Sequence, residues 1–375
     1  MRNSSKTGIL SKTIMLIRGA AYGITFMVCM DRIADTSDAF GARAFGIVAL
    51  ILITIAAFYL HLIAHEFGHM LLGLASGYSF VSFRIGSHVF VKQHGSIRHR
   101  KFKIPGTSGQ CIMAPPPYQN GRYPNVLYNL GGIIMNLLIS AVSLAILPAI
   151  RLDLVLFRSF FIMMIVLGIG TALMNGVPCQ AEVSNDGANV LFLAKDKAAS
   201  RGFWLALEIS RLQTVDGKRL KALDESLFEA DEAASMQNPL ASIPLVLREQ
   251  RKMDCQDFDG AMKLIEMLLS ESSALNGVSA ILLKLDRLYL DLLRHGAHAN
   301  RSVLEEASTR KFMRAMKYDP SVIRTLYAVS LVQKREDEQA ELSDRINRLR
   351  TAYFCPITVE AEMELMRVAE SRLSL

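Results

Sequence analysis

The sequence Phe45-Gly-Ile-Val-Ala-Leu-Ile-Leu-Ile-Thr-Ile-Ala-Ala-Phe-Tyr-Leu-His-Leu-Ile-Ala64, followed directly by His65-Glu66-Phe67-Gly68-His69, decides the fold of this chain. The apolar run carries no formal charge and has the length that a helix needs to cross about 30 Å of hydrocarbon. Residues four apart lie on one face of a helix, so His65 and His69 present their imidazoles side by side. An acid such as Glu66 beside an apolar segment is costly and is a candidate for function. We therefore predict a membrane-spanning helix that ends in a functional motif.

The spacing His-Glu-x-x-His on a helix is typical of a zinc site. Zinc binds neutral imidazole nitrogens, and with a third protein ligand it keeps one tetrahedral position open for water. Glu66 lies one residue around the helix, within reach of such a water, and is the candidate general base. The same pattern also arises by chance, and His65 and His69 are then hydrogen-bonded helix residues without a metal. The apolar run before the motif favours the metal.

The charge of the chain is divided unevenly between its halves. Of 42 basic and 35 acidic residues, residues 1–185 hold 15 and 6, which leaves 27 and 29 for residues 186–375. The basic character belongs to the apolar half, which favours contact with anionic lipid head groups. No basic helix interleaved with aromatic residues is present, so no nucleic-acid partner is expected. The 5 cysteines form no Cys-x-x-Cys pair, which argues against a disulfide framework and a cysteine zinc site.

The fold class that these patterns predict is mainly α, with a polytopic membrane domain at residues 1–195. About four membrane-spanning helices are expected, at residues 13–30, 45–75, 124–150 and 159–178. In the first of them, Arg18 reaches toward the interface. In the third, small residues at Gly131 and Gly132 allow a neighbouring helix to approach closely, and the Asn136 amide must find a partner in hydrocarbon.

Residues 78–123 and 196–375 differ from the membrane segments. In residues 78–123, apolar residues alternate with polar ones, which predicts a small β-hairpin region of two or three strands. An exposed strand edge there is suited to pair with an extended substrate. The glycine- and proline-rich stretches 105–111 and 115–117 are expected to be loops.

Residues 196–375 show helical periodicity, for example at residues 258–269 and 281–290, and Asp319-Pro320 begins a further helix. We expect a soluble α-helical domain, either a plain bundle or a set of helix-turn-helix repeats resembling tetratricopeptide units. Such a domain is a candidate for binding a protein partner.

The distribution of basic residues predicts the orientation in the membrane. The segments 1–18 and 80–124 contain 4 and 7 Lys and Arg, whereas the loops 31–44 and 151–158 contain 2 each. By the positive-inside rule, the amino terminus, the hairpin region and the helical domain are cytoplasmic. The prediction is a multi-pass protein of the cell membrane, with the His65–His69 motif on the cytoplasmic side.

The His65-Glu66-Phe67-Gly68-His69 motif in this setting resembles the site-2 protease family of intramembrane zinc metalloproteases. The segment from Gly131 to Asn136 is similar to a glycine-rich stretch of that family that ends in Asn. Asn175-Gly176-Val177-Pro178, followed by Asp186-Gly187, resembles its second motif, but with a longer spacing and without the usual second proline and leucine.

The resemblance implies one Zn²⁺ ion as cofactor and a membrane-protein substrate that is cleaved in or near a transmembrane segment. The residues it implies are His65, His69 and Asp186 as zinc ligands, Glu66 as catalytic base, and Asn175 and Asn136 as contacts to substrate.

Alternatives remain open for the third ligand and for the function. Asp186 is alternatively an ordinary helix N-cap, and Glu182 is then the substitute ligand. Cys179 lies close by, although a small buried residue is its simpler role. The alternative function is an inactive membrane scaffold or adaptor, with a vestigial metal site and a protein-binding helical domain. A metal transporter is a third and weaker alternative, because the second helix offers a single acid.

Overall fold

The computed structural model describes residues 2–36, 40–179, 184–271 and 275–373, which fold into two compact units. Unit 1 consists of Met1–Tyr78 and Pro124–Phe192, and unit 2 consists of Ser79–Tyr123 and Leu193–Leu375. Along the chain, the boundary between the units lies at residues 192–193, and residues 79–123 belong to unit 2.

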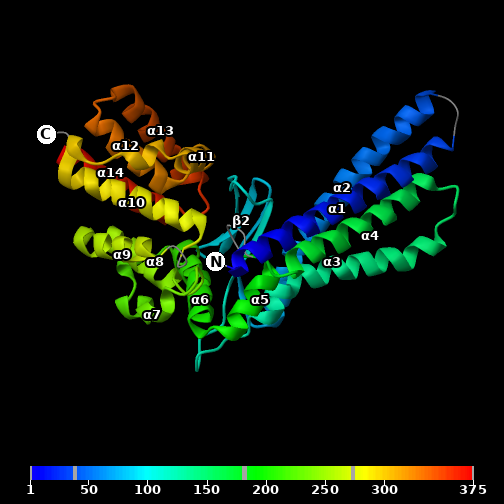
Figure 1. The fold of residues 1–375 in the computed structure, drawn as a ribbon, viewed down its shortest axis with the longest axis horizontal. Helices are drawn as coiled ribbons and strands as arrows, with labels where there is room; N and C mark the ends of the chain where they lie inside the picture. Colours follow the sequence, from blue (N-terminus) through cyan, green and yellow to red (C-terminus); the bar gives the residue numbers. More distant parts are fainter. Residues whose placement is uncertain (1, 37–39, 180–183, 272–274, 374–375) are drawn as a thin grey trace. The chain divides into compact units, whose positions relative to one another are not determined.

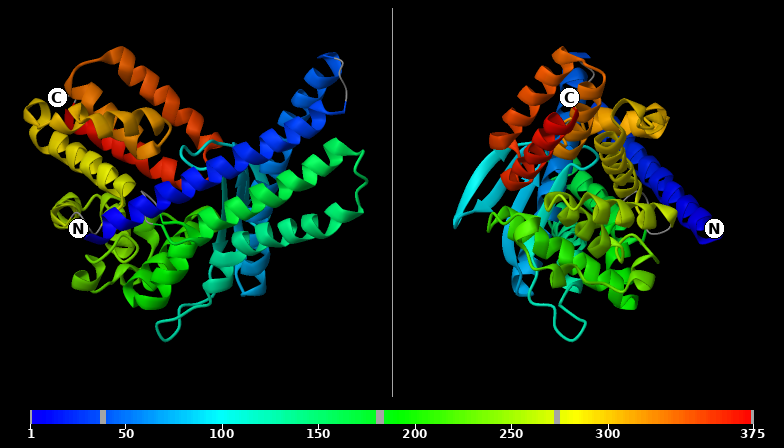
Figure 2. Two further views of the ribbon diagram at one scale, coloured as in Figure 1. Left: turned by 45° about the vertical axis from the view of Figure 1, so that its right-hand side comes forward. Right: turned by 90° about the vertical axis from the view of Figure 1, so that its left-hand side faces the viewer.

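Unit 1 is built from long helices that run side by side (Figures 1 and 2). Its helices are α1 (Arg2–Ala34), α2 (Phe40–Ala75), α3 (Val126–Ile146, continued by a 3₁₀ turn at Leu147–Ala149), α4 (Val155–Gly176) and the first part of α5 (Asp186–Lys195). Among the described residues, α2, α3 with its turn, and α4 are long and apolar enough to cross a membrane. The span predicted at residues 13–30 lies within α1 and stays a prediction.

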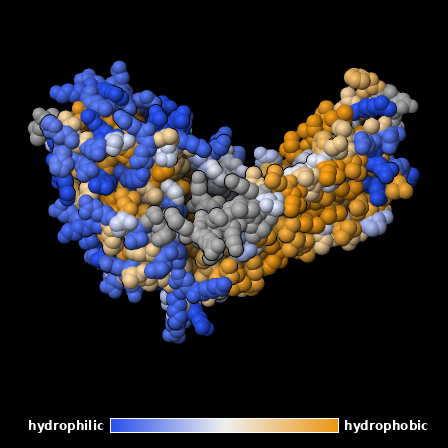
Figure 3. Space-filling view, in the orientation of Figure 1, coloured by the Kyte–Doolittle hydropathy of each residue, from blue (hydrophilic) through white to orange (hydrophobic). Residues whose placement is uncertain are grey.

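The outer surface of these helices is apolar, as Figure 3 shows for the face turned to the viewer. Large side chains such as Leu52, Leu138 and Phe157 are exposed on α2, α3 and α4. A contiguous apolar surface of this extent is rare on a protein surrounded by water and suits contact with hydrocarbon. The arrangement is consistent with the predicted membrane domain.

Glycines bring the helices of unit 1 into backbone contact. A Cβ atom added to Gly68 of α2 would lie 2.2 Å from the Gly131 carbonyl oxygen, and one added to Gly131 would lie 2.4 Å from the Gly68 oxygen. At Gly170 of α4, a Cβ atom would lie 2.1 Å from the hydroxyl of Tyr22 on α1. The prediction that Gly131 allows close approach of a neighbouring helix is confirmed.

Unit 2 contains a four-stranded antiparallel sheet of order β3-β2-β1-β4. Its strands are β1 (Ser79–Ile85), β2 (His88–Gln93), β3 (Ser96–Lys101) and β4 (Gly109–Ala114). Gly86 and Gly95 adopt positive φ angles of 58° and 80° at the two tight turns. The loop predicted at residues 105–111 is wrong from Gly109 onward, because Cys111 and Met113 turn inward and their strand pairs with β1.

The remainder of unit 2 is helical, as predicted. Its α-helices are α6 (Lys197–Thr214), α7 (Glu232–Ser235), α8 (Ile243–Asp254), α9 (Phe258–Ser270), α10 (Gly277–His295), α11 (Ala307–Ala315), α12 (Pro320–Val332), α13 (Glu336–Ala352) and α14 (Pro356–Leu373). Asp319 caps α12 by accepting hydrogen bonds from the backbone N–H groups of Ser321 and Val322. The predicted helix start at Asp319-Pro320 is confirmed.

Contacts with the helical part of unit 2 hold the sheet and the segments next to it. Gln93 of β2 donates a hydrogen bond to the Phe354 carbonyl (3.2 Å), and Trp204 of α6 donates one to the Pro116 carbonyl (2.9 Å). Phe102 packs edge-on against Tyr353, with 4.7 Å between the ring centroids. These contacts explain why residues 79–123 belong to the helical domain.

A buried group of charges lies in the core of unit 2. Arg324 is 1% exposed and forms ion pairs with Asp286 and with Glu362. Burial raises the pKa of Glu362 to about 7, although Arg324 opposes this rise. Burial and the neighbouring Asp286 raise the pKa of Glu249, which is 0% exposed, well above its usual value. The folded state of unit 2 therefore favours protonated carboxyl groups.

This charge group predicts that unit 2 loses stability as the pH rises. A carboxyl group with a raised pKa in the folded state binds a proton more tightly there than in the unfolded chain, whose value is about 4.3. We expect the free energy of unfolding to fall by about 1–3 kcal/mol between pH 5 and pH 8. Glu249→Gln keeps the shape without the charge and should flatten this dependence.

The fluorescence of Trp204, the 1 tryptophan of the chain, reports the unfolding of unit 2 in urea. The exposed Glu360→Gln is the matched control, because it removes a carboxylate from α14 without changing the core. An equally steep pH dependence in Glu249→Gln and in the unchanged protein would contradict the assignment.

Candidate metal centre

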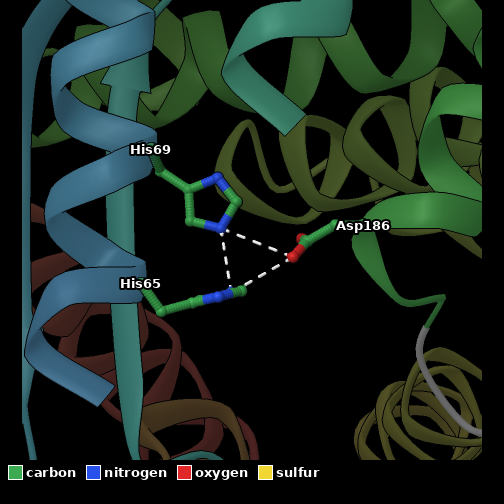
Figure 4. Close-up of side chains that lie close together, drawn as sticks. All are labelled: His65, His69 and Asp186. Atoms are coloured by element: carbon green, nitrogen blue, oxygen red, sulfur yellow. Dashed lines mark hydrogen bonds and ion pairs between the residues drawn. The ribbon is translucent and has the colours of Figure 1, made fainter. Parts of the chain in front are cut away.

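The three predicted ligands meet in unit 1 (Figure 4). His65 and His69 project from one face of α2, and Asp186 is the first residue of α5. The two imidazole Nε2 atoms are 3.2 Å apart, and Asp186 Oδ2 lies 3.2 Å from His65 Nε2 and 3.5 Å from His69 Nε2. The rings stand nearly perpendicular, at 84°, with centroids 4.7 Å apart.

These distances fit a metal ion. In a tetrahedral zinc site with metal–ligand bonds of about 2.0–2.1 Å, neighbouring ligand atoms are about 3.3–3.4 Å apart. His65 and His69 are 7% and 8% exposed, so their nitrogens are shielded from water. Asp186 Oδ2 is buried and has no other hydrogen-bond donor among the described residues. Three electron-pair donors that converge in this way could hold a metal ion between them.

Hydrogen bonds fix the proton on His69. Its Nδ1 lies 2.7 Å from the backbone carbonyl oxygen of Tyr128 on α3. A carbonyl oxygen only accepts, so Nδ1 carries the proton and Nε2 offers its lone pair to the site. The Tyr128 ring stacks on Tyr78, with centroids 4.7 Å apart, which holds this part of α3 against the end of α2.

The His65 ring lies flat against α3. A Cβ atom added to Gly132 would lie 2.4 Å from His65 Nδ1, so only glycine leaves room for the ring. The sequence suggested Gly132 as a helix-packing residue and missed its contact with a metal ligand. Sequence reasoning also missed the contact of Tyr128 with His69, because a backbone carbonyl is present in every residue type and gives no signal in the sequence.

Asn185 places Asp186 at the site. Its Oδ1 accepts hydrogen bonds from the N–H groups of Ala188 (3.0 Å) and Cys179 (3.1 Å). Its Nδ2 donates to the carbonyl oxygens of Met174 (2.8 Å) and Val177 (2.7 Å) at the end of α4. The N-cap of α5 is therefore Asn185, which leaves the Asp186 carboxylate free to face the imidazoles. Sequence reasoning missed this residue, although Asn before Asp-Gly is a helix-start signal.

Gly187 allows the start of α5 to approach the end of α4 closely. A Cβ atom added at this position would lie 2.0 Å from the Gly176 carbonyl oxygen and 3.2 Å from that of Asn175. The start of α5 therefore rests directly on the end of α4. Any side chain at position 187 would push Asp186 away from the two histidines.

The Asp186 carboxylate is ionised at neutral pH. Burial alone would raise its pKa, but hydrogen bonding to His65 and His69 and their charges lower the pKa to about 2. Asp186 thus offers the negative charge that a divalent cation needs.

The other predicted site residues lie in different surroundings. Glu66 is 8% exposed on α2, and its carboxylate interacts electrostatically with the His69 imidazole. Asn175 donates to the Thr171 carbonyl of its own helix (3.1 Å), and its contact with substrate stays a prediction. Asn136 is 0% exposed and lies against His65, a position that favours support of the ligand over contact with substrate. Glu182 lies outside the described residues.

Comparison of the chain with protein-family models, with characterised proteins and with solved structures gave no match. The class of protein is therefore described from its fold and its site alone. The protein is mainly helical, has three helices able to span a membrane among its described residues, and gathers a buried His65–His69–Asp186 group that fits a metal ion.

The geometry predicts that metal content depends on Asp186 and on Gly187. We expect Asp186→Ala and Gly187→Ala to lower zinc affinity by at least about tenfold, because one removes a ligand and the other displaces it. Zinc per protein is measured by elemental analysis of the detergent-purified chain. Gly41→Ala is the matched control, because a Cβ atom there meets no atom within 4 Å. Zinc that remains at the parent level in Asp186→Ala would refute the ligand set.

Proposed function

We propose that this protein is a zinc-dependent endopeptidase that cleaves a peptide bond in or near a transmembrane segment of a membrane-bound substrate. The observation that carries the proposal is the convergence of His65, His69 and Asp186, within 3.5 Å of one another, beside Glu66 on an apolar helix long enough to cross a bilayer. This is the constellation that zinc peptidases use for hydrolysis.

The chemistry divides between the ligands and Glu66. A zinc ion held by His65, His69 and Asp186 would polarise the scissile carbonyl and lower the pKa of water toward about 7. Glu66 takes a proton from the attacking water and passes it to the leaving amine. Its position supports this role, because Glu66 is buried on α2 beside the two imidazoles.

The surroundings of the ligands support a substrate that comes from the membrane. The motif follows the apolar part of α2, and its neighbours α3 and α4 expose apolar side chains. A peptide bond within a helical segment is protected by its own hydrogen bonds, so the substrate must become extended before hydrolysis. A segment rich in weak helix formers is therefore the expected site of cleavage.

The proposal predicts that a substitution of Glu66 abolishes cleavage without affecting zinc binding. Glu66→Gln should retain zinc and lose cleavage by a factor of about a hundred or more, whereas His65→Ala should lose both. Zinc is measured on the purified protein. Cleavage is measured as new peptide termini in the membrane proteome of cells that carry the parent chain or a variant. The exposed Glu360→Gln is the control for loss of a carboxylate.

The outcomes separate the proposed enzyme from the alternative adaptor. New termini that are present with the parent and absent with Glu66→Gln support the peptidase. Zinc in the parent without termini beyond those of cells that lack the protein favours a scaffold whose helical unit binds a partner. Undiminished cleavage by Glu66→Gln rejects Glu66 as the base.

A further inference from the structure

A third imidazole lies on the same face of α2, one turn before His65. His61 is 1% exposed, and its ring sits in a slot of α4, where a Cβ atom on Gly168 would lie 2.3 Å from His61 Cε1. Its Nε2 is 2.7 Å from the Met164 carbonyl oxygen, and its Nδ1 is 3.2 Å from the side-chain amide of Asn136. Both ring nitrogens are engaged, so His61 is not a further metal ligand.

Asn136 joins this imidazole to the metal centre. Its amide lies between His61 Nδ1 and His65 Nδ1, with 3.2 Å to each, and the residue is 0% exposed. Ser140 donates to the Asn136 backbone carbonyl (2.9 Å), one turn further along α3. A continuous chain of hydrogen bonds thus runs from the Met164 carbonyl through His61 and Asn136 to His65.

If all groups are neutral, a single placement of the protons satisfies every hydrogen bond between Met164, His61, Asn136 and His65. The Met164 carbonyl only accepts, so His61 Nε2 carries the proton of that ring and His61 Nδ1 accepts. The NH₂ group of Asn136 must therefore face His61, and its oxygen must face His65. The structure places Oδ1 of Asn136 toward His61 and Nδ2 toward His65, and a half-turn of the amide exchanges the two groups and leaves both contacts in place. The oxygen then accepts from His65 Nδ1–H.

The reverse orientation of the amide is unfavourable. With the oxygen toward His61, both nitrogens of that ring would have to donate, which places an imidazolium among apolar helices at high cost. The NH₂ group would then face His65 Nδ1 and force the His65 proton onto Nε2, where it blocks the ligand position. The neutral arrangement frees Nε2 of His65, just as the Tyr128 carbonyl frees Nε2 of His69.

We propose that Asn136, anchored by His61, is a positioning residue that holds His65 in the tautomer with its proton on Nδ1. The inference rests on the proposed metal site and replaces the substrate contact that the sequence suggested for Asn136. His61 acts on the metal only through Asn136. The Met164 carbonyl on α4 thereby selects the tautomer of His65 through the side chains of His61 and Asn136.

Metal affinity tests this proposal without any measurement of cleavage. Zn²⁺ dissociation constants are measured by chelator competition on the detergent-purified full chain, and the visible absorption of the Co²⁺ form reports the coordination. Asn136→Leu, which removes the acceptor at similar size, should weaken Zn²⁺ binding 10- to 100-fold and change the Co²⁺ spectrum. Asn136→Asp, which as a protonated acid keeps an acceptor toward His65 and a donor toward His61, should stay within a few-fold of the parent.

Three further variants separate positioning from packing. Asn129→Leu removes another buried amide of α3, one that donates to its own helix at Asn125, and should leave Zn²⁺ affinity unchanged. His61→Leu should weaken binding several-fold, and the double variant with Asn136→Leu should bind no more weakly than Asn136→Leu alone, because His61 acts through Asn136.

Parent-like affinity in Asn136→Leu overturns the positioning role while the metal site stands. Equal losses in Asn136→Leu and Asn136→Asp overturn it in favour of packing. A parent chain that binds no Zn²⁺ refutes the metal centre itself, and with it both proposals.

Discussion

Unit 1 depends on one electrostatic constraint, which is that two imidazole nitrogens and a carboxylate oxygen are held within 3.5 Å of one another, away from bulk water. Such an arrangement is unfavourable unless a cation compensates it, since buried electron-pair donors without a partner cost several kcal/mol. The fold must therefore hold these three groups in place against their mutual repulsion. It does so with the i, i+4 spacing on α2 and with a rigid link between α4 and α5.

Glycines hold these groups in place, because a residue without a side chain lets helices and rings pack directly against its backbone. Gly131 lets α3 touch α2, Gly132 and Gly168 receive the rings of His65 and His61, and Gly187 sets Asp186 against the end of α4. An imidazole that lies flat on a backbone has little freedom to rotate, so its nitrogens point in one direction. Hydrogen bonds then decide which nitrogen carries the proton. Close packing and tautomer control are thus two results of the same helix contacts.

Sequence patterns located the ligands but not the groups that support them. The apolar length of α2 and the spacing of His65 and His69 are local, and local periodicity was enough to find them. The support from Asn185, His61 and the Tyr128 carbonyl depends on which helices become neighbours, which no single segment records. The same limit explains β4, whose short alternation is hidden among glycines and prolines, and the membership of residues 79–123 in unit 2, which rests on contacts with distant Phe354 and Trp204.

The altered second motif, which lacks the usual second proline and leucine and has a longer spacing between Asn175 and Asp186, is the best support for a vestigial site. The structure shows that this distance along the chain does not set the position of the carboxylate. Asn185 binds the carbonyl oxygens at the end of α4, and Gly187 rests on the Gly176 carbonyl, so the last link before Asp186 is fixed whatever the length of the preceding loop. An inserted loop costs little when both of its ends are anchored, because loop-closure entropy grows only slowly with length. The altered second motif is therefore compatible with a working metal centre, and the choice between peptidase and adaptor rests on Glu66.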